Sequence, residues 1–105
     1  MDARAERVGK NEAVFREVNE RINDITREDA AEYLCECGNA NCTETIQMTV
    51  AEYEGVRADP THFAVLPGHE IPDVEDVVAR NERFLVVRKK AGPAAALATE
   101  LDPRT

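Results

Sequence analysis

The chain has 105 residues, which is enough for one domain with a thin hydrophobic core. Its 21 acidic and 13 basic residues give a formal net charge of −8, so we expect it to bind neither nucleic acids nor anionic membranes. No residue is a serine, which excludes mechanisms that use a serine nucleophile.

The segment Met1–Arg7 lacks the apolar stretch of a secretory signal, and no apolar run is long enough to span a membrane. Three cysteines in such a chain are more typical of thiolates than of a disulfide framework. Together these features predict a cytoplasmic protein. Ten of the 13 basic residues are arginine, which is typical of a GC-rich bacterial genome.

Residues 1–10 are charged without periodicity and predict a flexible N-terminus. A helix is predicted over 12–26, with Asn11 as its N-cap. Its buried face is expected to carry the apolar residues that repeat at helical spacing, Val14, Val18, Ile22 and Ile25.

The middle of the chain predicts a hairpin followed by a short helix. A strand over 31–36 and a second one around Ile46 and Met48 would be joined by a loop over 37–42. The capping box Thr49–Glu52 predicts a helix that begins at about Val50 and ends before Pro60.

The C-terminal part predicts further short strands. A third strand is expected over 63–66, and a second hairpin from 77–79 and 84–87, although 73–79 could instead form a helical turn. Residues 91–105 form an Ala/Pro tail that predicts one helical turn or an unstructured segment. The fold class is therefore α+β, with a single zinc-stabilised domain over 11–90.

The spacing Cys-x-Cys-x4-Cys at Cys35, Cys37 and Cys42 predicts a metal site. Two cysteines one residue apart on a strand point to the same side, and the glycine and asparagines that follow allow the chain to curl back. Zinc binds four ligands in a tetrahedron and favours thiolate and imidazole. Zinc is therefore the predicted cofactor.

The fourth ligand must be one of the two histidines, His62 or His69. His69 is preferred because it follows the Pro67-Gly68 turn, which can project its side chain toward the cysteines, and Glu70 could supply a carboxylate that orients it. The predicted ligands are Cys35, Cys37, Cys42 and His69. Tyr33, Leu34 and Leu66 are expected to pack around them.

Other interpretations of the thiols stay open at this point. They could be free and redox-active, they could form a disulfide with Cys37 and Cys42 as the best pair, or they could bind an iron–sulfur cluster or copper. Glu36 and Glu44 would raise the thiol pKa values, which favours a metal site. In an open zinc site, Glu36 or Glu70 would be the candidate bases.

Two charged segments carry weaker signals. The acidic stretch from Glu70 to Asp76 lacks the ligand spacing of a calcium loop and is expected to be a solvated face. Basic residues clearly outnumber acidic ones at one cluster in the sequence, which consists of Arg80, Arg83, Arg88, Lys89 and Lys90.

The stretches Tyr33–Cys37, Cys42–Glu44, Glu52–Arg57 and Pro67–Glu70 resemble those of a group of small, uncharacterised bacterial proteins. The resemblance runs from about Asn11 to Lys90. It implies that the cysteine loop and the Pro-Gly-His-Glu turn belong to one pattern, and it implies no activity.

These features favour a non-enzymatic, zinc-stabilised module for protein interaction or regulation, whose expected partner is an unidentified protein. A redox-responsive zinc switch is the alternative, and a small zinc or thiol enzyme is the third interpretation.

Overall fold

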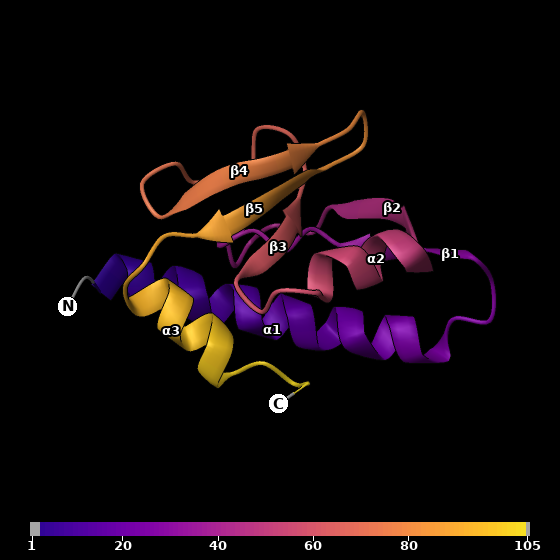
Figure 1. Ribbon diagram of the computed structural model, residues 1–105, viewed down its shortest axis with the longest axis horizontal. Helices are drawn as coiled ribbons and strands as arrows, with labels where there is room; N and C mark the ends of the chain where they lie inside the picture. The colour runs from indigo at the N-terminus through magenta and orange to yellow at the C-terminus, as the bar shows by residue number, and fades with distance from the viewer. Residues whose placement is uncertain (1–2, 105) are drawn as a thin grey trace.

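The computed structural model describes residues 3–104, and the side chains of residues 6–93 and 95–104. The elements follow the order α1 (Ala3–Ile25), β1 (Ala30–Leu34), β2 (Thr45–Thr49), α2 (Val50–Arg57), β3 (His62–Val65), β4 (Glu75–Arg80), β5 (Leu85–Lys89) and α3 (Pro93–Glu100). The predicted α+β class is confirmed. The long helix α1 runs below the strands, and α3 lies beside its N-terminal half (Figure 1).

The strands form two small antiparallel sheets. β1 pairs with β2, so that Tyr33 lies opposite Ile46, and the second sheet has the order β3-β5-β4. Residues 75–80 therefore form a hairpin with β5 rather than a helical turn, and the pairing shifts register between Val77 and Ala79. The first hairpin is confirmed, but β1 ends two residues before the predicted end of its strand, so Cys35 and Glu36 lie in a loop that runs from residue 35 to residue 44.

α2 begins where the capping box predicts. The Thr49 hydroxyl accepts a hydrogen bond from the Glu52 amide at 3.0 Å, and the Glu52 carboxylate accepts one from the Thr49 amide at 2.9 Å. Tyr53 on α2 stacks on Tyr33 of β1, with 4.5 Å between the ring centroids. This pair links α2 and the first hairpin within the core.

α1 differs from its prediction in both extent and orientation. It begins at Ala3 rather than at residue 12, so residues 3–10, which were assigned to a flexible N-terminus, are helical. Val14 is 60% exposed and Ile25 is 75% exposed, so the predicted apolar stripe does not form the buried face. The buried positions are instead Val8, Gly9, Glu12, Arg16 and Asn19.

The polar residues on this face are buried because each has a partner outside α1. Arg16 donates to the carbonyl oxygens of Pro60, at 2.6 Å, and His62, and its guanidinium lies 3.6 Å from the centre of the Phe63 ring. Asn11 is not an N-cap: its amide donates to the Gly38 carbonyl oxygen at 2.9 Å. Hydrogen bonds to distant segments thus decide which side of α1 faces inward.

Gly38 allows the cysteine loop to approach α1 closely. A Cβ atom at this position would overlap the side chain of Val8. The loop therefore requires a glycine here for space, beside the hydrogen bond from Asn11.

The C-terminal segment is also more ordered than the Ala/Pro tail predicted over 91–105, because α3 covers eight of its residues and packs against α1. The predictions for Met1, Asp2 and Thr105 lie outside the described residues. None of the described helices combines the length and the apolar character needed to cross a membrane.

A buried charge cluster joins α1 to the second sheet. Lys89 of β5 lies in ion-pair contact with both Glu12 of α1 and Glu75 of β4, and all three side chains are almost fully buried. The Lys89 ammonium group donates a hydrogen bond to the Glu75 carboxylate, whereas neither oxygen of Glu12 accepts one. Burial raises the pKa of Glu12 to about 8, although the charge of Lys89 acts in the opposite direction.

We expect this cluster to make stability depend on pH. Between pH 4.5 and 8 the folded chain keeps a proton on Glu12 that the unfolded chain has released, so the free energy of unfolding falls as the pH rises through this window. Glu12→Gln keeps the neutral form at every pH and should be more stable than the native chain at pH 9, where the native chain must bury an ionised Glu12. Urea unfolding at pH 5 and pH 9 measures this difference.

Glu17→Gln is the matched control, because Glu17 is an exposed glutamate on the same helix. It should follow the native pH profile. If the profiles of Glu12→Gln and the native chain run parallel, Glu12 is not the titrating group.

Candidate metal centre

Four side chains that the sequence singles out converge at one place. The sulfur atoms of Cys35, Cys37 and Cys42 and a ring nitrogen of His69 all lie within 4.8 Å of one another. His69 Nδ1 is 3.6 Å from Cys35 Sγ and 3.7 Å from Cys42 Sγ. Cys35 and Cys37 are buried, whereas Cys42 and His69 are partly exposed.

These distances suit a tetrahedral zinc ion. With Zn–S bonds of about 2.3 Å and a Zn–N bond of about 2.0 Å, sulfur and nitrogen ligands would be about 3.5 Å apart, and two sulfurs about 3.8 Å apart. The two measured sulfur–nitrogen distances are 3.6 and 3.7 Å. The cluster can therefore hold a metal ion after small side-chain adjustments.

The backbone around Glu36 aligns the first two cysteines with β3. The Glu36 amide donates to the Ala64 carbonyl oxygen at 2.8 Å, and the Leu66 amide donates to Cys35 Sγ at 3.3 Å. The segment 35–37 therefore runs along the outer edge of β3. The chain leaving β3 at Leu66 reaches His69 only three residues later.

A turn at Pro67-Gly68 brings His69 back toward the cysteines. Gly68 has a φ of +89°, a conformation that favours glycine, and the His69 amide donates to the Leu66 carbonyl oxygen at 2.9 Å. A glycine at position 68 is therefore part of how the fourth ligand is positioned.

Glu44 orients the imidazole ring of His69. Its carboxylate lies 2.9 Å from His69 Nε2, on the far side of the ring from the sulfur atoms. When Nε2 carries the proton, Nδ1 presents its lone pair to the thiols, which is the tautomer that a metal ligand needs.

The sequence assigned the orienting role to Glu70, and this prediction is wrong. Glu70 accepts a hydrogen bond from the Gly68 amide at 2.8 Å and thus stabilises the turn itself. Glu44 stands two residues after Cys42, and the spacing alone did not indicate that it reaches across to the turn.

Glu36 is also not a base at this site. It is fully buried, and its carboxylate accepts hydrogen bonds from the Asn19 side chain at 3.0 Å and the Ala64 amide at 3.1 Å. Burial raises its pKa, and the charge of Arg16 opposes this effect. The carboxylate faces α1, while the neighbouring cysteines face His69.

The core surrounds the buried side of the centre in part as predicted. Tyr33 belongs to the same apolar cluster as Cys35 and Cys37, and Leu66 packs against this cluster. Leu34 is not among the members of the described core.

Burial raises the pKa values of the Cys35 and Cys37 thiols. The charges of the neighbouring thiolates add to this effect, whereas the Leu66 amide hydrogen bond opposes it at Cys35. Buried thiols whose pKa is raised are poor nucleophiles without a positive charge nearby. A divalent metal ion at this position would supply that charge and displace the protons.

His62 lies away from the cysteines. Its Nε2 atom is 3.7 Å from the Asp59 carboxylate, and its ring lines a cleft between α2 and the second hairpin, together with Phe84 and Val78. The structure therefore brings His69, and not His62, to the three thiols.

No family model matches this chain, and no curated protein or solved structure matches it either. The resemblance to small bacterial proteins thus stays a prediction. The function must be argued from the geometry of the site.

The two histidines give a matched pair of variants. His69→Ala should lose zinc to a chelator about as readily as Cys42→Ala, because each variant removes one of four ligands. His62→Ala should retain the metal and change the free energy of unfolding by less than about 0.5 kcal/mol. A zinc-indicator titration of the three variants measures the order, and the reverse ranking of the histidines would contradict the assignment.

Glu44→Gln tests the orienting carboxylate. Because the ligands remain, zinc should still bind, but with an affinity about tenfold lower. Glu70→Gln keeps an acceptor for the Gly68 amide and serves as the control, with native affinity. Competition with a chelator of known affinity measures both, and equal affinities for the two variants would exclude the role of Glu44.

Proposed function

We propose that this chain binds one zinc ion through Cys35, Cys37, Cys42 and His69, and that the ion is structural. The observation that carries the proposal is the convergence of three thiols and one imidazole nitrogen within 4.8 Å of one another, with two sulfur–nitrogen distances of 3.6 and 3.7 Å. Thiolate and imidazole together favour zinc over calcium or magnesium, which prefer oxygen ligands.

The arrangement supports a structural rather than a catalytic ion. Four protein ligands fill the coordination shell and leave no position for a substrate or a reactive water. The two carboxylates that the sequence offered as bases are engaged elsewhere, because Glu36 hydrogen-bonds to Asn19 and Glu70 to the Gly68 amide. The third nearby carboxylate, Glu44, is paired with His69 Nε2. The ion would tie the first hairpin to the turn after β3.

The second part of the proposal is a non-enzymatic role in protein interaction or regulation. The net charge of −8 favours a basic protein surface as the partner over a nucleic acid. The basic cluster near the second hairpin does not reverse this preference. Lys89 is buried between two glutamates, Arg83 pairs with Glu52 at 2.6 Å, and Lys90 lies 3.8 Å from Asp76.

One observation favours a redox-responsive switch as the second candidate. Cys42 is the most exposed of the three thiols, so an oxidant would reach it first. Hydrogen peroxide would convert the Cys42 thiolate to a sulfenic acid with release of hydroxide, and the Cys37 thiol would then form a disulfide with release of water. Loss of two ligands would eject the zinc ion.

We expect the purified chain to contain about one zinc ion, and removal of the ion to lower the thermal unfolding temperature sharply. Elemental analysis and thermal unfolding with and without chelator measure these properties. A metal-free chain that unfolds at the native temperature would contradict the structural role.

Exposure to dilute peroxide separates the two candidates. A structural site should keep its zinc for many minutes, because two of its sulfur ligands are buried. Rapid zinc release with a Cys37–Cys42 disulfide, reversed by reductant and fresh zinc, would make the switch the better account. A zinc-indicator time course with mass spectrometry follows both events.

A further inference from the structure

A second charged site lies in a groove between α1, α2 and the C-terminal segment. The groove has a volume of about 590 Å³. Eight residues line it, and four of them are acidic: Glu17, Glu20, Asp24 and Glu54, with Arg21, Asn23, Pro103 and Arg104. The groove shares no residue with the metal centre.

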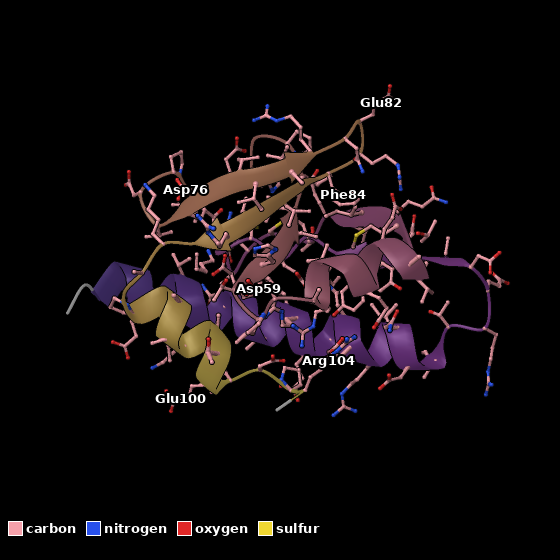
Figure 2. The ribbon with its side chains drawn as sticks, viewed as in Figure 1. Asp59, Asp76, Glu82, Phe84, Glu100 and Arg104 are labelled. Atoms are coloured by element: carbon pink, nitrogen blue, oxygen red, sulfur yellow. The ribbon has the colours of Figure 1, made fainter. Side chains whose placement is uncertain are left out.

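The guanidinium group of Arg104 occupies this groove between two carboxylates. Its Nη1 and Nη2 atoms donate to the two oxygens of Glu54 at 3.0 and 2.6 Å. Nε and Nη2 donate to the two oxygens of Glu20, the latter at 3.0 Å. Figure 2 shows Arg104 at the end of the chain, near α1 and α2. Each of the four carboxylate oxygens thus accepts a hydrogen bond from the planar guanidinium group. A lysine ammonium group cannot reproduce this geometry.

Other groups hold both carboxylates in place. The Tyr53 hydroxyl, from a fully buried ring, donates to Glu20 at 2.8 Å, and Arg57 donates to Glu20 at 3.3 Å. The Asn23 amide donates to Glu54 at 2.9 Å. The two acceptors are therefore positioned by α1 and α2 without the help of Arg104. This is how a preformed binding site for a guanidinium group is built.

We propose that Glu20 and Glu54 bind an arginine side chain of a basic protein partner, and that Arg104 occupies this site in the free chain. The proposal rests on the interaction role suggested above and names the chemistry of the partner. When Arg104 leaves, Arg57 still contacts Glu20 and Asp102, and Arg21 lies at the groove. The four acidic residues that line the groove outnumber these two arginines, so it keeps an excess of negative charge. Glu17 and Asp24 on its rim would attract further basic residues of the partner.

The tethered Arg104 sets the strength of this site. A side chain on the same chain competes at an effective concentration of roughly millimolar, so a single foreign arginine binds the native chain weakly. A partner with several basic residues overcomes the competition and releases the C-terminal segment. Binding of the partner and release of this segment are therefore coupled.

The experiment uses the full chain and a glycine-rich peptide with one arginine, titrated by NMR at low salt. Arg104→Ala should bind this peptide about tenfold more tightly than the native chain, because the competitor is gone. The same peptide with lysine should bind several-fold more weakly. Adding Glu54→Gln to Arg104→Ala should abolish the gain.

A folded Arg104→Ala chain that binds the arginine peptide no better than the native chain would overturn the proposal, as would equal binding of the two peptides. If the Arg104→Ala chain does not fold, the arginine peptide is titrated into the native chain instead. Excess arginine peptide should shift the Arg104 Nε–H signal toward that of a free side chain, and an unchanged signal overturns the proposal.

Zinc content, measured on the same samples, separates this inference from the proposed function. Bound zinc without peptide binding would exclude the arginine site alone. Peptide binding by a chain that takes up no zinc would exclude the metal centre and leave the arginine site standing.

Discussion

The pairing of Glu36 with β3 determines where the metal centre forms. Its backbone amide and its carboxylate both bond to Ala64, so a residue between two cysteines is joined to the second sheet by its main chain and its side chain. Because side chains alternate along an extended segment, the carboxylate faces α1 while Cys35 and Cys37 face the opposite side. β3 then delivers His69 to that side through a short turn. The Leu66 amide bond to Cys35 Sγ and the Glu44 contact with His69 then join the loop to the turn itself.

α1 supports the same region with polar rather than apolar contacts. Asn19 donates to Glu36 and to the Leu34 carbonyl oxygen, and its own oxygen accepts from the Leu34 amide at 2.7 Å. Arg16 satisfies two carbonyl oxygens just before and at the start of β3. A buried polar group is costly unless it is paired, so these contacts specify one position of the helix against the strands. A zinc ion would add a covalent tie on the other side of the same segment.

Local signals in the sequence predicted the parts of the fold that depend on neighbouring residues. Alternation at Ile46 and Met48 predicted β2, the capping box predicted the start of α2, and the cysteine spacing with His69 predicted which four side chains meet. The predicted orientation of α1 was wrong. An apolar stripe predicts the buried face of a helix only if the polar residues on the other faces are solvated, and in α1 several of them have buried partners. The partners of Glu12 and Arg16 lie dozens of residues away. Glu44 and Arg104 were missed for the same reason, since only the folded chain brings them to His69 and Glu54.

The central claim is that three sulfur atoms and one imidazole nitrogen surround a single zinc ion. X-ray absorption at the zinc edge on the purified chain tests it most directly. The account predicts three sulfur ligands at about 2.3 Å and one nitrogen at about 2.0 Å, with the nitrogen contribution lost in His69→Ala and kept in His62→Ala. A first shell made mainly of oxygen, or fewer than three sulfur ligands in the reduced chain, would contradict it.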